Sequence, residues 1–186
     1  MNELLEYLGT ALGLIYLLLA IREQRTCWIA GALASAVFFF VFLRSGLPAQ
    51  ALLQVYYIAI AVHGWIVWGR VDDRILVSRL TIRHHASLVG LWILLGVGTV
   101  AVAGQFLNAV AWFDSLTSWG GVLATWLVAR KFLDAWIYWV VIDTASALLY
   151  LSQDLRATAV LYGVYTALAA VAWHEWRQSS ANSRTS

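Results

Sequence analysis

The sequence repeats itself at an offset of 108 residues, and the repeated segments are apolar and rich in tryptophan. With no gap, this offset aligns three pairs of tryptophans: Trp28 with Trp136, Trp65 with Trp173 and Trp68 with Trp176. It also aligns Gly13 with Gly121, Arg22 with Arg130, Leu47 with Leu155, Leu53 with Leu161 and Tyr57 with Tyr165. Because tryptophan is a rare residue, three such pairs in one register are hard to obtain by chance. We therefore expect two copies of one structural unit.

The apolar content of the chain indicates that these units lie in a membrane. Hydrophobic residues make up 62% of the sequence and charged residues 12%, against about 25% charged residues in a soluble domain. The mean hydropathy is +0.75, and the apolar runs are continuous rather than alternating, which favours helices over a barrel. No basic region precedes Leu4 and no small-residue cleavage site follows the first run, so that run is expected to be a retained helix.

Seven apolar runs are expected to cross the bilayer, at about 4–21, 28–43, 48–68, 86–104, 112–129, 135–151 and 155–173. The repeat pairs the first three runs with the last three, which leaves the fourth as a linker and predicts a 3+1+3 plan. Because one span separates the two units, they have the same orientation and form a parallel repeat. The expected divisions are a first three-helix bundle at 1–69, a basic cytoplasmic loop with the linker helix at 70–111, a second bundle at 112–178 and a cytoplasmic tail at 179–186.

The distribution of basic residues predicts the orientation of the chain. The loops after the odd-numbered spans and the carboxyl-terminal tail hold ten lysines and arginines, and the opposite side holds only Arg44 and Arg156. The positive-inside rule then places the amino terminus outside and the carboxyl terminus in the cytoplasm. The arginine-rich segment 70–83 is accordingly interpreted as a determinant of topology, and no nucleic-acid partner is expected.

One span carries an aromatic stripe with a carboxylate at membrane depth, where ionisable groups are costly and usually functional. Its members are spaced by three or four residues and share a helix face: Trp136, Trp139, Asp143, Ser146 and Tyr150. Stacking rings beside one carboxylate would suit a planar, heteroaromatic and cationic ligand. The alternative is that Asp143 bonds a neighbouring helix and only stabilises the bundle.

The third and seventh spans carry further candidates at equivalent positions of the repeat. Gln54 and Tyr57 correspond to Tyr162 and Tyr165, as expected for a pocket between two similar halves, although packing between helices would give the same pattern. The tryptophans at the ends of these spans are expected to be interfacial anchors: Trp65, Trp68, Trp173 and Trp176.

No enzymatic function is expected, because no nucleophile lies in an activating motif and no glycine loop for phosphates is present. No cofactor or metal is expected either, since His84 and His85 have no carboxylate at metal-binding spacing and His174-Glu175 lacks a second histidine. An internal repeat of spanning helices favours a carrier of a small molecule. A non-transporting membrane scaffold and an intramembrane enzyme are the rival classes, and a homo-oligomer is possible.

Three stretches together resemble a known family. They are Ala51-Leu-Leu-Gln-Val-Tyr-Tyr57 with His63-Gly-Trp-Ile-Val-Trp68, then Trp112-Phe-Asp-Ser115, and finally Ala129-Arg-Lys-Phe132 with Trp136-Ile-Tyr-Trp-Val-Val-Ile-Asp143. The chain is similar over essentially its whole length to the PnuC family of bacterial vitamin transporters, whose best-known members carry nicotinamide riboside.

The resemblance implies a 3+1+3 fold related to the SWEET sugar transporters, in the bacterial inner membrane. It also implies facilitated diffusion of the vitamin, which a cytoplasmic kinase phosphorylates and so retains. It places the pocket at Gln54, Tyr57, Trp136, Trp139 and Asp143. The chain departs from carriers of nicotinamide riboside at Asp143 and Ala34, where asparagine is frequent in those proteins. Because the family includes thiamine and riboflavin carriers, these two vitamins are the alternative substrates.

Overall fold

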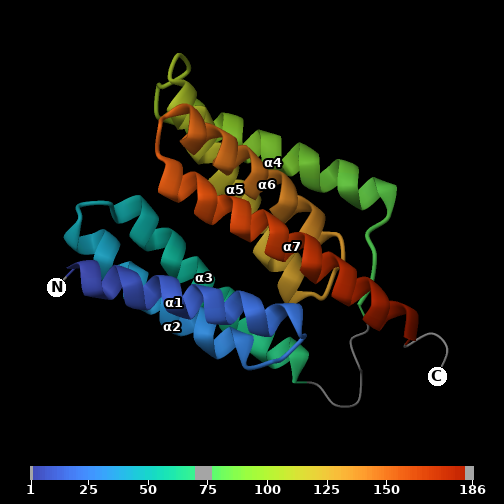
Figure 1. The fold of residues 1–186 in the computed structure, drawn as a ribbon. Coiled ribbons are helices and arrows are strands. Elements are labelled where there is room, and N and C mark those ends of the chain that lie inside the picture. Colours follow the sequence, from blue (N-terminus) through green and yellow to red (C-terminus); the bar gives the residue numbers. More distant parts are fainter. Residues whose placement is uncertain (1, 70–76, 183–186) are drawn as a thin grey trace.

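The computed structural model describes residues 2–69 and 77–182, and these residues form seven helices (Figure 1). The helices are α1 (Asn2–Ile21), α2 (Cys27–Arg44), α3 (Pro48–Trp68), α4 (Ile82–Val102), α5 (Ala109–Ala129), α6 (Ala135–Ser152) and α7 (Arg156–Asn182). Each apolar run expected from the sequence corresponds to one helix. Of the basic residues used to predict orientation, Arg70, Arg74 and Arg184 lie outside the described residues.

Five of the described helices are long and apolar enough to cross a membrane: α1, α2, α3, α4 and α6. The other two are as long but more polar. Helix α5 carries Asp114, Ser115, Thr117 and Ser118 within three turns, and the last two turns of α7 are polar.

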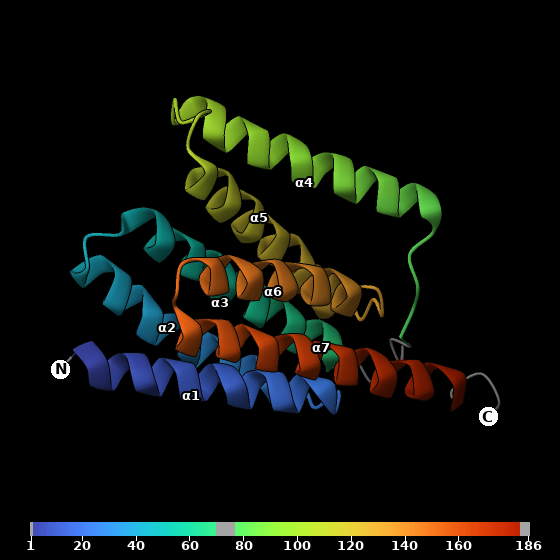
Figure 2. The ribbon, with the colours of Figure 1, turned by 45° about the horizontal axis from the view of Figure 1, so that its top comes forward.

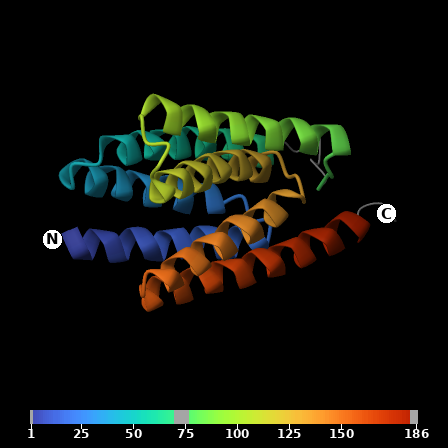
Figure 3. The same ribbon diagram turned by 90° about the horizontal axis from the view of Figure 1, so that it is seen from above.

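The helices run roughly along one common direction (Figure 3). Helix α1 packs on α2 and α2 on α3, while α5 packs on α6 and α6 on α7. The two groups meet through α1 with α7 and through α3 with α5. Helix α4 packs on α5 and lies at the periphery (Figure 2). We call the end at which α1 begins the amino-terminal end. The opposite end, which carries Arg22, Arg25, Arg130 and Lys131, is the basic end.

The connecting turns have the same backbone geometry in both groups of helices. In the turns α1–α2 and α5–α6, Glu23 and Lys131 donate their amide N–H to the carbonyl three residues earlier, at 3.0 and 2.9 Å. Both residues adopt positive φ, at 53° and 56°. At the other end, Gly46 and Asp154 close the turns α2–α3 and α6–α7 with φ of 70° and 59°. Because 108 separates the members of each pair, the internal repeat extends to hydrogen bonding in the turns.

Four tryptophans close the basic end of the bundle, and we call them the tryptophan quartet: Trp28, Trp68, Trp136 and Trp176. Trp28 meets Trp68 edge to face at 5.3 Å between ring centroids, and Trp136 meets Trp176 in the same way at 5.3 Å. Trp68 and Trp176 join the two halves at 5.7 Å. The expected interfacial anchoring is therefore wrong for Trp176, which is fully buried. Its indole N–H is satisfied inside the protein by the carbonyl of Ala20.

An ion pair between equivalent positions of the repeat reinforces this closure. Lys131 Nζ lies 2.9 Å from a carboxylate oxygen of Glu23, and both side chains are largely buried, with 16% and 20% exposed. The ammonium of Lys131 also lies 5.0 Å from the ring centroid of Trp68. A contact between residues 108 positions apart lies where the two halves of the repeat meet.

The segment before α4 is attached to the turn between α5 and α6. Ser78 donates its amide N–H to the carbonyl of Lys131 at 3.1 Å and accepts the N–H of Leu133 at 2.9 Å, as an isolated parallel bridge. Two residues later, the amide of Leu80 donates to a carboxylate oxygen of Asp134 at 2.6 Å. The segment before α4 is thus held by backbone and carboxylate hydrogen bonds rather than by apolar packing alone.

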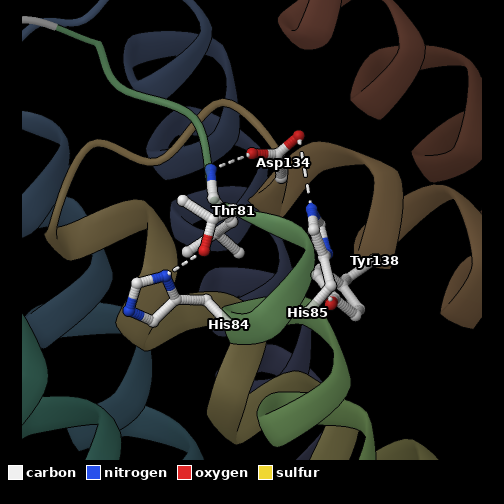
Figure 4. Close-up of polar contacts among 6 residues, drawn as sticks. Thr81, His84, His85, Asp134 and Tyr138 are labelled. Carbon is white, nitrogen blue, oxygen red and sulfur yellow. Dashed lines mark hydrogen bonds and ion pairs between the residues drawn. The ribbon is translucent and has the colours of Figure 1, made fainter.

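Two histidines of the first turn of α4 complete this attachment (Figure 4). His85 Nδ1 lies 2.9 Å from the hydroxyl of Tyr138, and its other ring nitrogen lies 3.9 Å from the carboxylate of Asp134. His84 lies 2.7 Å from the hydroxyl of Thr81. This polar cluster is at the basic end and positions α4 against α6, away from the cavities described below.

Candidate functional site

A cavity of about 440 Å³ lies among α2, α3, α5, α6 and α7. It reaches the amino-terminal end, since the exposed residues Val110 and Gln153 line it. We call it the outer cavity. Its polar lining residues are Gln50, Tyr57, Asp114, Thr117, Ser118, Asp143, Ser146, Tyr150, Gln153 and Tyr162.

The aromatic stripe of α6 faces this cavity because its members recur on one side of the helix. Trp139, Asp143 and Tyr150 all line it. Asp143 lies in the middle of α6 and is 6% exposed. Its carboxylate makes no hydrogen bond or ion pair with another described residue, whereas the nearby hydroxyl of Ser146 donates to the carbonyl of Ile142 at 2.9 Å. A buried carboxylate without such a partner is costly in a protein, so it is available to a cationic or hydrogen-bonding ligand.

Three tyrosines extend the aromatic wall from α6 to α7. Tyr150 stacks on Tyr162 with 5.2 Å between ring centroids and an interplanar angle of 29°. Tyr162 meets Tyr165 edge to face at 5.9 Å. The outer cavity therefore offers both the indole of Trp139 and phenol rings as surfaces on which a planar ligand can stack.

Two smaller cavities adjoin the outer one. The first inner cavity, of about 220 Å³, shares Tyr57 and Trp139 with the outer cavity. The second inner cavity, of about 170 Å³, shares Trp139 and Asp143 with it. The chain is closely packed at Gly121, where the outer and inner cavities meet, because a Cβ at that position would lie 3.0 Å from the hydroxyl oxygen of Tyr57. Tyr57, Trp139 and Asp143 thus separate the outer space from the inner spaces.

The structure brings together most of the residues selected from the sequence. Tyr57, Trp139, Asp143, Tyr150 and Tyr162 line the outer cavity. Trp136 and Tyr165 line the second inner cavity instead. Gln54 is half-buried on α3 and lines none of these three cavities, since the face of α3 toward the outer cavity carries Gln50, Leu53 and Tyr57. Ala34 lines the first inner cavity.

Sequence reasoning missed the polar face that α5 contributes. Asp114, Thr117, Ser118 and Gly121 line the outer cavity. Their spacing of three and four residues in an apolar segment was a usable signal of a helix face turned toward a polar space. Gln50, one turn before Gln54, was missed as well.

The ionisable side chains of the outer cavity are acidic. Among its described lining residues, the charged side chains are the carboxylates of Asp114 and Asp143, with no lysine or arginine. Two carboxylates repel a phosphate and attract a cation. The site is therefore suited to a cationic or neutral ring compound with polar substituents.

Apolar helices in two similarly packed groups, with an aromatic and acidic cavity between them, are typical of a polytopic membrane carrier. Comparison with known proteins identifies its family. Residues 3–178 match the family model described as nicotinamide mononucleotide transporter. The chain belongs to this family of vitamin transporters, which includes PnuC, and it is a multi-pass protein of the bacterial inner membrane.

Relatives in this family have different named substrates. The riboflavin/roseoflavin transporter RibM of Streptomyces davaonensis is 28% identical over 178 residues, covering 92% of this chain and 83% of RibM. The nicotinamide riboside transporter PnuC of Escherichia coli is 24% identical, covering 95% of this chain and 86% of PnuC. A crystal structure of the vitamin B3 transporter PnuC matches with a TM-score of 0.74 at 13% identity, over 96% of this chain and 82% of that one. This last likeness confirms the all-helical fold.

Proposed function

We propose that this protein imports nicotinamide riboside, the nucleoside form of vitamin B3, through the bacterial inner membrane. The observation that carries the proposal is the position of Trp139 beside Asp143 in the outer cavity. The indole can stack on the pyridinium ring, and the carboxylate can neutralise its fixed positive charge. Tyr57, Tyr150 and Tyr162 surround the same space and can bind the ribose hydroxyls or the carboxamide. Gln54, Trp136 and Tyr165 are assigned a supporting role around it.

The acidic side chains of the cavity favour a nucleoside over a nucleotide as the ligand. A phosphate would lie near Asp114 and Asp143 without a described lysine or arginine in the cavity wall, and such a site is unfavourable for an anion. We therefore propose that the unphosphorylated vitamin is carried, by facilitated diffusion. A cytoplasmic vitamin kinase would then retain it by adding the phosphate.

Riboflavin is the second candidate, and two observations favour it. The stack of Tyr150 on Tyr162 enlarges the aromatic wall, which suits a wider ring system. RibM, at 28% identity, is named as a riboflavin transporter. Thiamine, also a fixed cation, is supported by the charge of Asp143 alone.

The proposed architecture is a 3+1+3 parallel repeat of SWEET-like type, with bundles at 1–69 and 112–178, the loop and linker helix at 70–111, and the tail at 179–186. Its support is the packing order of the helices and the recurrence of the turn hydrogen bonds at the repeat offset. Transport would then be a rocking of the two bundles about the ligand.

The basic end is proposed to face the cytoplasm. A Ser78→Cys reporter in a Cys27→Ala background should react with an impermeant thiol reagent only from the cytoplasmic side.

The test of the substrate is binding of nicotinamide riboside, riboflavin and thiamine to the purified protein. Asp143→Asn should weaken the cations about 10- to 100-fold, because hydrogen bonds to charged groups contribute about 1.5–3 kcal/mol. It should affect riboflavin much less. Asp114→Asn is the matched control, since Asp114 lines the same cavity but is exposed.

Each result decides between functions. Selective loss of the cations supports nicotinamide riboside or thiamine, and tight binding of riboflavin to both variants supports the second candidate. If the parent binds none of the three and Asp143→Ala changes no measurable activity, the result favours the rival function of a non-transporting membrane scaffold. Counterflow of the bound vitamin in proteoliposomes, with no ion gradient, tests facilitated diffusion.

A further inference from the structure

A groove of about 350 Å³ runs along α5 between α3 and α4. Helices α3 and α4 both pack on α5, but among the described residues they do not pack on each other. Helix α5 therefore forms the floor of the groove, and the other two helices form its walls. Both wall helices are apolar enough to cross a membrane, and Leu52 and Thr99, one from each wall, are exposed. This space, which we call the lateral groove, thus opens sideways toward the lipid.

Hydrogen bonds between helices hold both walls of the lateral groove in place. On the α4 side, the indole N–H of Trp119 donates to the hydroxyl of Thr99 at 2.8 Å. On the α3 side, the hydroxyl of Tyr56 donates to the carbonyl of Val122 at 2.8 Å. All four residues line the groove. Because these bonds lie within the protein, the shape of the groove does not depend on an occupant.

The lateral groove is polar at the membrane surface and apolar below it. Gln50 lies in the first turn of α3 and Asp114 in the second turn of α5, both near the amino-terminal end. Tyr56, Trp119 and Val122 line the deeper part. The helical rise from Asp114 to Val122 is about 12 Å, and one leaflet of the hydrocarbon core is about 15 Å thick. The groove therefore has the length and the polarity of a phospholipid in a single leaflet.

The charge at the polar end of the groove selects the headgroup. Among the described lining residues, the only charged side chain is the carboxylate of Asp114, which is exposed. A carboxylate without a lysine or arginine beside it attracts an ammonium group and repels an anionic headgroup. It also accepts hydrogen bonds from a primary ammonium, which a quaternary ammonium cannot donate. The side-chain amide of Gln50 can donate to the phosphate that adjoins the ammonium.

We propose that the lateral groove binds one phospholipid with a primary-amine headgroup, from the leaflet at the amino-terminal end. The ammonium lies at Asp114, and an acyl chain follows α5 past Trp119 to Val122. This site goes beyond the proposed function, because it faces the lipid and does not depend on which vitamin is carried. Gln50 and Asp114 also line the outer cavity, so the bound headgroup forms part of the rim of that cavity between α3 and α5.

The internal repeat supplies a matched pair of variants for the test. Leu52 and Val160 are equivalent positions of the repeat near the start of α3 and α7, and they are 70% and 68% exposed. Leu52 lines the lateral groove, whereas Val160 lines none of the cavities described above. Leu52→Trp should obstruct the groove, and Val160→Trp places the same ring elsewhere on the surface. Asp114→Asn tests the headgroup, with Asp154→Asn, an exposed carboxylate at the same end, as its control.

Lipid binding is measured by native mass spectrometry of delipidated protein, titrated separately with phosphatidylethanolamine, phosphatidylcholine and phosphatidylglycerol. The parent should bind its first phosphatidylethanolamine about 3- to 10-fold more tightly than either other lipid, as one hydrogen-bonded headgroup provides. Asp114→Asn should remove this preference, and Asp154→Asn should keep it. Leu52→Trp should weaken the first binding step about 3- to 10-fold, and Val160→Trp should stay within about 2-fold of the parent. All four variants should keep the melting temperature of the parent, because these side chains are exposed.

Three results would overturn the proposal. Equal affinity of the parent for the three lipids would exclude selection of the amine headgroup by Asp114. Equal lipid binding by Leu52→Trp and Val160→Trp would exclude the groove as the site. A photoreactive diazirine amino acid in place of Leu52 identifies the neighbour in native membranes: cross-linking to phospholipid supports the proposal, and cross-linking to a second copy of this chain makes the groove a protein interface instead. The vitamin-binding test uses other ligands, so the proposed function and the lipid site fail independently.

Discussion

The ion pair between Glu23 and Lys131 should control how often the basic end opens. The two residues join equivalent turns of the two halves at 2.9 Å, directly beside the tryptophan quartet. Any movement that separates the halves at this end must break the pair. The perturbation we choose is Glu23→Gln, which removes the charge and keeps the shape of the side chain. Lys131→Gln and the double variant complete a cycle that isolates the interaction.

The magnitude follows from the geometry of the pair. At 2.9 Å, the Coulomb attraction is about 6 kcal/mol in a medium with an effective dielectric constant of 20. Desolvation and side-chain ordering offset most of it. Exposed pairs contribute about 0.2–1 kcal/mol, and breaking a buried pair costs about 3–5 kcal/mol. With 16% and 20% of the two side chains exposed, the pair lies between these cases. We expect a coupling of about 1–2 kcal/mol, which is a 5- to 30-fold change in the closed-to-open ratio.

Labelling of the native cysteine measures how often the basic end opens. Cys27 is the single cysteine of the chain and is fully buried at the basic end, within the same core as Trp28 and Trp176. When closing is fast, the rate of its labelling by a maleimide is proportional to the open population. Labelling of protein in nanodiscs should accelerate about 5- to 30-fold in Glu23→Gln.

Asp154→Asn is the control, because it breaks another 2.9 Å ion pair, with Arg156, that lies at the amino-terminal end and is more than 80% exposed. It should leave labelling unchanged. Equal labelling rates in Glu23→Gln and the parent, at equal melting temperature, would refute the role of the ion pair in closure.

Three further substitutions test the junction of the cavities and the attachment of the segment before α4. Gly121→Ala should lower both ligand affinity and melting temperature, because its Cβ would lie 3.0 Å from the hydroxyl of Tyr57 and overpacking costs about 1–3 kcal/mol. At the equivalent position, Gly13→Ala meets nothing within 4 Å and should raise the melting temperature through helix propensity. Equal effects of Gly121→Ala and Gly13→Ala on the melting temperature would refute the argument that only Gly121 lies at a tight junction. Asp134→Asn should speed hydrogen exchange of the Leu80 amide, which donates to that carboxylate at 2.6 Å. Unchanged exchange in the variant would show that the carboxylate does not hold the segment before α4.

The helices could be predicted from the sequence because their signal is local. A continuous apolar run that must satisfy its own backbone in lipid has no alternative to a helix. The internal repeat was equally accessible, because tryptophan pairs such as Trp28 and Trp136 are improbable coincidences. The aromatic stripe of α6 was predicted from a spacing of three and four residues, and Trp139 and Asp143 do line one cavity.

Contacts between distant segments could not be predicted in the same way. The sequence indicated interfacial anchoring for Trp176, since tryptophans at the ends of spans usually meet the lipid headgroups. In the structure it is fully buried against Trp68 and Trp136. Nothing local distinguishes these two environments, since the difference depends on which helices cross at that point. The pairing of Glu23 with Lys131 could not be predicted either, because it also depends on which distant segments meet.

The backbone and the side chains of the repeat impose different requirements on a carrier. On the proposed function, recurring turns let two similar bundles rock as units about the ligand. An asymmetric ligand, however, needs an asymmetric surface. The chain provides it by substitution at equivalent positions: Trp139 replaces Gly31, Asp143 replaces Ser35 and Tyr150 replaces Phe42. All three changes add ring area, charge or a hydroxyl to the carboxyl-terminal half. On the proposed function, that half holds the polar end of the ligand in every state, and the amino-terminal half moves past it.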